Sequence, residues 1–428
     1  MNRNTLWGTF AVLLLLILAG LVSQQEASSI DFFDNASTLA TQSTVSQTDM
    51  SQAAASTTQL VDANNRFGFE LFTRLQTSSK LENVFISPQS VAIALAMLRN
   101  GTAGETLAEI NSTLGLEPYD ADSINRSYSQ LIETLTTADE SIDLAIANSL
   151  WIDENIELED SFINTTQEFY RSRATNLDFA DPSARETINN WVASNTAHQI
   201  PQIVDRITPE DMLYLINAVY FKGSWTKKFN PSQTTQQPFT LDADTTKSVE
   251  MMSQSGDYRY YENEQFQAVR LPYGLQEEMG MYIFLPQPDR NLNQFNRQLN
   301  ADSWREWLSQ MRSQPGSLTL PKFRLEYDLE LKNVLTAMGI EQAFDPARAD
   351  FSAMTDSELA VDTVKHKAVV EVNEAGTEAA GVTSIGVRIT SAMPQDESFN
   401  MKIDRPFFFA IRDDITETIL FMGNVVEP

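Results

Sequence analysis

The clearest pattern along this chain is a segment near its C-terminal end in which every second residue is uncharged. From Thr377 to Ile389 the alternate positions carry no charge, whereas Glu378 and Arg388 fall on the opposite face. Period-two alternation predicts a β-strand with one face that can be buried. The segment nevertheless begins with glycines and small residues, which are typical of a loop. A segment suited to both structures predicts a conformational switch.

Periodic segments elsewhere predict a mixed, mostly antiparallel α+β domain. Ser87 can cap a helix whose first turn contains Pro88, and Val91 to Leu98 is apolar nearly all round, so we expect this helix to be buried. Apolar spacing predicts further helices over residues 64–75, 103–114, 185–199 and 329–338, the last closed by Gly339. Strands are predicted over residues 144–152, 213–220, 281–285, 317–325 and 367–372, followed by a C-terminal hairpin of 406–411 and 420–423.

The N-terminal part of the chain predicts targeting rather than folding. Residues 1–27 contain Arg3 and then an apolar run from Leu6 to Val22, which suits either a signal peptide or an uncleaved N-terminal membrane anchor. Residues 28–61 are rich in Ser, Thr, Gln and Ala and are expected to form a flexible tether. We therefore expect one folded domain over residues 62–428, located outside the cytoplasm and either secreted or anchored to a membrane.

Composition and charge exclude several classes of function. The chain of 428 residues carries a net charge of −28, which disfavours binding to nucleic acid, and to anionic lipid except through the N-terminal segment. It has no cysteine, so disulfides and thiolate chemistry are excluded. The two histidines, His198 and His366, lack the spacing of metal ligands, and we expect neither a metal site nor a cofactor.

No catalytic motif stands out in the sequence. A Ser-His-Asp triad built on His198 or His366 lacks the Gly-x-Ser-x-Gly elbow that would support it, and there is no phosphate-binding glycine loop. Both histidines are interpreted as hydrogen-bonded packing residues. From its residues alone, the chain is a large domain without a catalytic signature, and we do not expect an enzyme.

Several motifs occur in a fixed order along the predicted domain. They are Asn83 to Ser90 followed by Ala94 to Leu98, Asn217 to Trp225, Leu320 to Phe323, Met338-Gly339, Ala343-Phe344, His366 to Ala368, Glu374 to Thr383, Asp404 to Phe407 and Phe421 to Gly423. In this order they resemble the serpin family of serine protease inhibitors, in particular inhibitory members of the type that bacteria secrete or anchor to a membrane. The resemblance implies a monomer with three β-sheets, about eight or nine helices and an exposed reactive-centre loop.

The resemblance also implies a mechanism. A serpin offers its loop to a protease as a substrate, and the cleaved loop then inserts into the central sheet and traps the acyl-enzyme. Insertion turns unpaired loop backbone into a strand with two neighbours. This agrees with the pattern of residues 377–389, which suits both a loop and a strand. A charge on the face that becomes buried would cost several kcal/mol and stall entry, and this chain keeps that face uncharged.

The resemblance assigns roles to individual residues. It implies a hinge of Glu374, Gly376, Thr377, Glu378, Ala379, Ala380, Gly381 and Thr383. It implies a hydrogen-bonded cluster of Ser87, Ser90, Asn217 and His366 beneath the strands that open, with Trp225 near the point of insertion. Sixteen positions after Glu374, the family spacing implies a reactive bond between Thr390 and Ser391, with Arg388-Ile389 as the rival.

These bonds imply different target proteases. Thr390 suits an elastase-like or subtilisin-like serine protease, whereas Arg388 would suit a trypsin-like one. Residues 120–140, which correspond to the heparin-binding helix of some serpins, contain Arg126 as their one cation, so we expect no heparin binding. Two alternatives stay open: a non-inhibitory serpin that acts as a binding protein, and a cross-class inhibitor of cysteine proteases.

Overall fold

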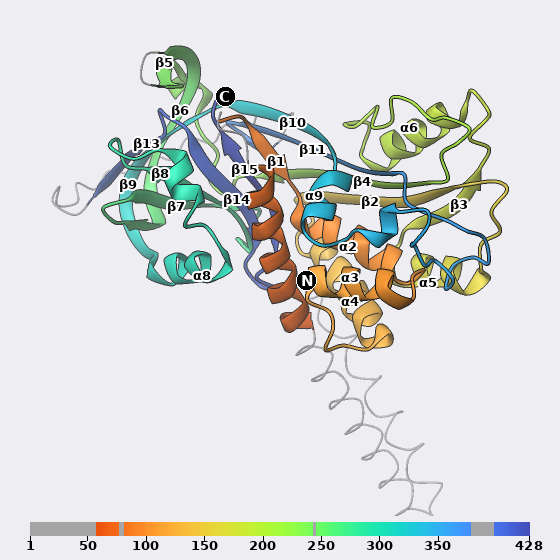
Figure 1. The fold of residues 1–428 in the computed structure, drawn as a ribbon. Helices are drawn as coiled ribbons and strands as arrows, with labels where there is room; N and C mark the ends of the chain where they lie inside the picture. Colours follow the sequence, from red (N-terminus) through yellow and green to blue (C-terminus); the bar gives the residue numbers. More distant parts are fainter. Residues whose placement is uncertain (1–56, 77–80, 243–244, 378–397) are drawn as a thin grey trace, which may run out of the picture. The chain divides into compact units, whose positions relative to one another are not determined.

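The computed structural model describes residues 57–76, 81–242, 245–377 and 398–428 (Figure 1). The predicted targeting segment, residues 28–56 of the predicted tether and both candidate reactive bonds lie outside these residues, as do the hinge positions Glu378, Ala379, Ala380, Gly381 and Thr383. Among the described residues, none of the helices combines the length and apolar character that crossing a membrane requires.

The described helices include all those that the sequence predicted. A helix covers residues 57–75, so it already includes residues 57–61 of the predicted tether, where Leu60 and Val61 are buried. The other α-helices are α2 (Pro88–Arg99), α3 (Gly104–Leu114), α4 (Ala121–Thr137), α5 (Asp160–Tyr170), α6 (Ala184–Asn195), α7 (Leu292–Asn296), α8 (Ala301–Gln310) and α9 (Lys332–Ala337).

The described strands form two hydrogen-bonded sheets. The larger has the order β1-β15-β14-β8-β7-β6-β9-β13 with β5 attached to β6, and the other has the order β10-β11-β12-β4-β2-β3. The strand bounds are β1 (Val84–Ile86), β2 (Ile142–Asp153), β3 (Arg173–Leu177), β4 (Leu213–Ser224), β5 (Thr235–Thr240), β6 (Thr246–Glu262), β7 (Phe266–Tyr273), β8 (Met279–Pro286), β9 (Arg312–Pro321), β10 (Phe323–Glu330), β11 (Thr363–Asn373), β12 (Gly376–Thr377), β13 (Phe399–Lys402), β14 (Phe407–Asp413) and β15 (Ile419–Val425).

The resemblance implied three sheets, and the long strand β6 explains the difference. Its first part pairs with β5, its middle with β9 and its end with β7. One strand thereby joins two sets of strands into a single hydrogen-bonded path. The α+β class and the antiparallel C-terminal hairpin of β14 and β15 are as predicted.

The six-stranded sheet is covered on both faces by helices (Figure 1). Helix α2 packs on one face, and all twelve of its residues are buried, as its apolar sequence predicted. Ser87 caps its N-terminus by accepting a hydrogen bond from the Ser90 N–H, and Pro88 occupies the first turn. On the opposite face, Ile188 and Val192 of α6 pack against Ala147 and Ile216 of the sheet. The long strands β2 and β4 are therefore fixed from both sides.

Three predicted elements were wrong in their extent, one of them the helix over 185–199, which ends at Asn195 as α6. The predicted strand over residues 317–325 is two strands: β9 ends at Pro321 and pairs with β6, whereas β10 begins at Phe323 and pairs with β11. Alternation continues through this crossing because both strands bury one face, so the pattern does not show that the partners change. The predicted helix over 329–338 begins only at Lys332, because Leu329 still pairs with His366 in the sheet.

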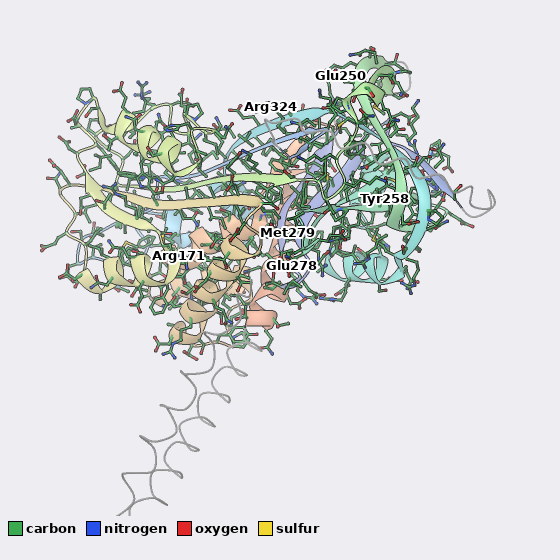
Figure 2. The ribbon with its side chains drawn as sticks, turned by 180° about the vertical axis from the view of Figure 1, so that it is seen from behind. Arg171, Glu250, Tyr258, Glu278, Met279 and Arg324 are labelled. Atoms are coloured by element: carbon green, nitrogen blue, oxygen red, sulfur yellow. The ribbon has the colours of Figure 1, made fainter. Side chains whose placement is uncertain are left out.

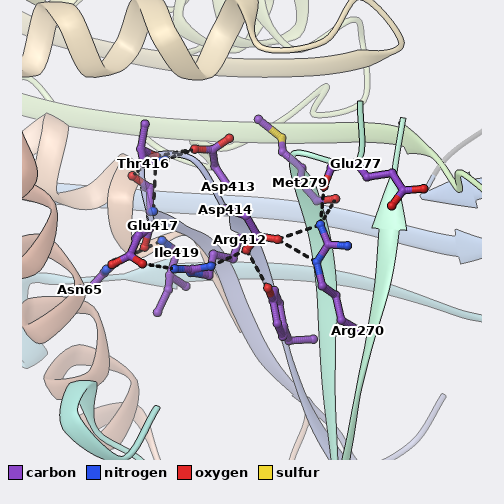
Figure 3. A network of polar contacts seen from close by, with 12 residues as sticks. Asn65, Arg270, Glu277, Met279, Arg412, Asp413, Asp414, Thr416, Glu417 and Ile419 are labelled. Carbon is purple, nitrogen blue, oxygen red and sulfur yellow. Dashed lines mark hydrogen bonds and ion pairs between the residues drawn. The ribbon is translucent and has the colours of Figure 1, made fainter. Parts of the chain in front are cut away.

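A buried ion network joins the ends of strands in the larger sheet (Figure 3). The Arg270 guanidinium donates from Nε to the Asp414 carboxylate at 2.7 Å, and the Tyr282 hydroxyl donates to the same carboxylate at 2.7 Å. Arg412 pairs with Asp414 and also with Glu417, the latter at 3.0 Å. Two buried arginines thus share one aspartate, and their remaining bonds fasten the hairpin turns at this end.

Candidate functional site

One end of the six-stranded sheet is open enough to hold the beginning of another strand. Strand β11 pairs directly with β4 in parallel over the seven residue pairs from Thr363↔Tyr214 to Val369↔Tyr220. Beyond these pairs, β12 lies between them, antiparallel to both, with Thr377 opposite Val372 on one side and Gly223 on the other. The sequence therefore turns back at the end of β11 and starts a new central strand.

Hydrogen bonds to its backbone carbonyls hold the turn that connects β11 to β12. The Trp225 indole N–H donates to the Asn373 carbonyl at 2.9 Å, and the Trp225 backbone N–H donates to the Ala375 carbonyl at 3.1 Å. The Phe229 N–H donates to the Glu374 carbonyl at 2.9 Å. Each carbonyl of the turn thus has a donor, which is why the turn is fixed although it lies at the end of the sheet.

The side chain of Glu374 ties the same turn to Thr234 and Lys322. Its carboxylate accepts a hydrogen bond from the Thr234 hydroxyl at 2.8 Å and lies 3.4 Å from the Lys322 ammonium, which also lies 3.4 Å from Glu250. Burial alone would raise the pKa of Glu374, but the Thr234 hydrogen bond and the Lys322 charge lower it. Glu250, the second carboxylate at the Lys322 ammonium, is labelled near the top of Figure 2.

The first residues of β12 fit closely between their neighbours. A Cβ atom on Gly376 would collide with the Gly223 carbonyl, so only glycine fits there without displacement. Thr377 is fully buried, and its hydroxyl forms a 2.7 Å hydrogen bond with the Tyr273 hydroxyl. The Tyr273 ring stacks on Trp225 with centroids 4.4 Å apart. The side of β12 that carries Thr377 therefore faces the core.

Farther along the sheet, a row of polar side chains crosses three neighbouring strands. Asn148 of β2 is in register with Asn217 of β4, which is in register with His366 of β11. The Asn217 amide donates to the Asn148 side-chain carbonyl at 2.5 Å and also to the Ser90 hydroxyl. The row thus links the closed part of the sheet to the N-terminal turn of α2.

His366 is neutral in this row. The Ser87 N–H donates to His366 Nε2 at 3.2 Å, which requires a lone pair on Nε2, so Nδ1 carries the proton and donates to Asn217 Oδ1. Burial lowers the pKa of His366 to about 3, because the imidazolium would lose its hydration inside the domain. The hydrogen bonds and the burial both favour the uncharged ring.

Comparison with known proteins identifies the family. A family model described as serpin (serine protease inhibitor) matches residues 62–428. The chain belongs to the serpin family. The leukocyte elastase inhibitor of Equus caballus is 33% identical over 383 residues, which cover 86% of this chain and 100% of that serpin. An uncharacterized serpin-like protein of Thermococcus kodakarensis is 36% identical over 373 residues, which cover 86% of each chain.

Solved serpin structures confirm the fold. The native state of tengpin, a thermophilic serpin, has a TM-score of 0.79 and 30% identity, and the match covers 86% of this chain and 94% of that one. Human thyroxine-binding globulin complexed with thyroxine has a TM-score of 0.80 and 28% identity, with 87% and 99% covered. The serpin fold expected from the sequence motifs is therefore confirmed.

The structure brings the described candidate residues into two groups. Glu374, Gly376, Thr377 and Trp225 lie together at the open end, and Ser87, Ser90, Asn217 and His366 lie together in the polar row. His198 is exposed and belongs to neither group.

Sequence reasoning missed three residues that complete these groups, namely Tyr273, Thr234 and Asn148. Asn148 had a signal, because it is a polar residue within the mostly apolar run of the strand predicted over residues 144–152. Tyr273 and Thr234 had none, because their sequence context does not show that the hinge packs on them.

The buried histidine predicts a pH dependence of stability. Because His366 has a folded-state pKa of about 3 and an unfolded value near 6.5, the unfolded chain binds more protons as the pH falls below 6.5. We expect the unfolding free energy of the uncut serpin to fall by about 2 kcal/mol between pH 6.5 and pH 5 from this residue alone. Urea unfolding midpoints measured across this range test the prediction.

One variant separates His366 from the carboxylates that also titrate at low pH. His366→Gln should flatten the profile between pH 6.5 and pH 5 while lowering stability overall. A His366→Gln protein with the full wild-type slope would contradict the assignment.

Proposed function

We propose that this serpin inhibits serine proteases as a suicide substrate and traps the acyl-enzyme by inserting its cleaved loop between β11 and β4. The observation that carries this proposal is β12, which has already started the additional strand at the open end of the sheet. The similarity to relatives such as the leukocyte elastase inhibitor supports the same proposal.

The register of β12 predicts where the following residues would go. Each further residue of the loop would move one position back along both neighbours, so position 380 would reach Val369 and Tyr220. These two residues form the last direct pair between β11 and β4, and insertion must separate them first. Three positions later, Thr383 would arrive between His366 and Asn217 and separate the polar row.

The same register explains the pattern of charges in the segment. Thr377 faces the core, so period-two alternation places Ala379, Gly381 and Thr383 on the buried face of the inserted strand. Position 378 would lie on the other face, next to Lys222 and Glu371. A loop that lacked this alternation would bury a charge and stop at the first direct pair.

Insertion would release enough free energy to deform a partner. A strand over positions 378–386 would reach the beginning of β11 and would gain two neighbours while replacing one existing interface. With about one net hydrogen bond gained per residue and ~1 kcal/mol for each, the gain is on the order of 10 kcal/mol. This is comparable to the stability of a whole domain.

The proposed target is an elastase-like or subtilisin-like protease that cleaves between Thr390 and Ser391, and Arg388-Ile389 would instead select a trypsin-like one. The serpin would encounter its target protease outside the cytoplasm, because residues 1–27 would direct the chain there or anchor it to a membrane. Thyroxine-binding globulin shows that a serpin fold can carry a ligand, so a binding protein is the alternative function, and a cysteine protease is the alternative target.

The buried face of the hinge gives the first functional prediction. When the wild-type serpin is mixed with elastase or subtilisin, a covalent complex at the summed mass should survive SDS gel electrophoresis. Thr377→Arg places a charge on the face that must be buried, so this variant should be cleaved without forming the complex.

A matched control introduces arginine at the next residue of the chain. Glu378→Arg carries its charge on the exposed face and should still form the complex. Complex formation by Thr377→Arg at the wild-type yield would refute insertion as the trap, and cleavage of the wild-type chain without any complex would favour the binding-protein alternative.

Cleavage of the loop gives a further prediction about stability and position. Cutting the loop with a catalytic amount of a protease that the serpin does not trap should raise the Tm of the serpin by tens of degrees, because the cut loop becomes a central strand. Mass spectrometry of the C-terminal fragment that an equimolar amount of the trapped elastase or subtilisin produces should show Ser391 as its first residue. A fragment beginning at Ile389 would move the reactive bond to the arginine, and an unchanged Tm would contradict insertion.

A further inference from the structure

Among the described residues, two large apolar side chains are mostly exposed, and they lie on neighbouring turns. Leu275 is 86% exposed in the turn between β7 and β8, and Ile415 is 67% exposed in the turn between β14 and β15. The Asp414 N–H donates to the Glu278 carbonyl at 2.7 Å and so joins the two turns. A single exposed apolar residue is ordinary in a soluble protein, so it indicates a contact surface only where the turn that carries it shows further features.

The turn that carries Leu275 is fixed by hydrogen bonds to other segments. The Asp139 carboxylate accepts a hydrogen bond from the Leu275 N–H at 3.2 Å. The Gly274 N–H donates to the Ser224 carbonyl at 2.8 Å, and the Thr226 hydroxyl donates to the Gly274 carbonyl at 2.6 Å. The backbone at Leu275 is therefore held in place while its side chain points into solvent, so a partner would meet it without first ordering the turn.

The same turn contains strained backbone that its surroundings hold in place. Glu277 has a φ of 58°, in the left-handed region that costs a residue other than glycine some strain. The buried Arg270 guanidinium donates to the Glu277 carbonyl and keeps it there (Figure 3). Gly274 has a φ of 71°, and a Cβ atom at this position would collide with the Asp139 carboxylate. A fixed and strained turn thus presents Leu275 to the outside.

The surface around Leu275 is acidic. Glu140 and Glu277 are exposed, and neither forms an ion pair with a cation in the described part of the chain. An apolar group beside unpaired carboxylates fits a partner surface that has an apolar patch with lysine or arginine side chains around it. It does not fit an anionic surface, because the carboxylates would repel it.

The turn lies beside the point where the reactive segment leaves the sheet. Ser224, which accepts the bond from Gly274, is in register with Gly376 of β12. Tyr273, the residue before the turn, shares a hydrogen bond with the hydroxyl of Thr377. A protease bound to the reactive segment is tethered to this end of the sheet by the segment itself. Its surface outside the substrate cleft is therefore the surface that can meet the turn.

We propose that Leu275 is a docking contact for the target protease, separate from the cleft that holds the reactive segment. The partner surface is an apolar patch with basic side chains around it. Docking would keep the protease on the serpin for longer before acylation, so a larger share of encounters would lead to the covalent complex. The contact would act before cleavage and leave the later insertion unchanged. This proposal rests on the proposed inhibitory function.

The rate of complex formation tests the contact. Second-order rate constants are measured with elastase and with subtilisin. For the protease that the wild type traps faster, Leu275→Ser should lower the rate constant about tenfold, because an apolar contact of the interface is lost. Leu275→Met keeps an apolar side chain and should react at the wild-type rate. The stoichiometry of inhibition and the Tm should stay unchanged, since Leu275 is 86% exposed in the serpin itself.

The neighbouring turn supplies a matched control. Ile415→Ser removes the other exposed apolar side chain, but its turn is bonded through Asn65 to the helix over residues 57–75 rather than to β4. This variant should react at the wild-type rate. Glu277→Gln should lower the rate roughly twofold at low salt and have no effect at high salt, because salt screens the attraction between exposed charges.

A protease whose active-site serine is replaced by alanine separates docking from trapping. Leu275→Ser should bind this inactive protease with a Kd about tenfold higher than that of the wild type. Equal rates and equal Kd values for the two serpins would overturn the docking contact, and so would an equal slowing by Ile415→Ser. A lower Tm or a changed stoichiometry in Leu275→Ser, with the rate unchanged, would show a structural role instead.

Two further outcomes keep this proposal distinct from the others. A dimer of the wild type in sedimentation that Leu275→Ser abolishes would assign the leucine to a second copy of the chain and overturn protease docking. Failure of the wild type to trap either active protease would refute inhibition, whereas the Kd values for the inactive protease would still decide whether Leu275 is a contact.

Discussion

The direct pairing of β11 with β4 is the interaction on which the rest of the structure depends. It closes the six-stranded sheet over Thr363 to Val369 and leaves the sheet open only where β12 begins. Helix α2 packs on one face of this sheet and α6 on the other, so its long strands β2 and β4 are held from both sides. A fold closed in this way has a defined place for one additional strand, and the residues near the opening decide whether it is filled.

The polar row across β2, β4 and β11 makes the closed pairing specific and still reversible. Hydrogen bonds of this kind contribute about 1 kcal/mol each, while a buried partner left without one costs more. The row therefore resists separation unless new partners arrive with the entering strand. In the proposed insertion, the hydroxyl of Thr383 arrives between His366 and Asn217, and it can both donate and accept. A charged histidine would oppose this exchange, and burial keeps the ring neutral.

Much of the fold could be predicted from the sequence because apolar spacing reflects burial directly. The buried helix α2, its cap at Ser87 and the C-terminal hairpin follow from local pattern alone. The break between β9 and β10 could not be predicted, because alternation records which face is buried and does not record which strand is the partner. For the same reason Glu374 could be singled out by motif, whereas Thr234, which binds its carboxylate, could not.

The N-terminal anchor of the reactive segment gives the proposed switch a direction. It consists of hydrogen bonds to Trp225, Phe229 and Thr234, which would keep the turn in place while the strand after it grows. At the other end of the segment the chain enters β13, which among the described strands is an edge strand paired with β9. Cutting the chain between these two ends would free only the part that must travel. Because the start of β12 is already paired with β11 and β4, the cleaved end would move toward the sheet from a fixed starting point rather than by random search.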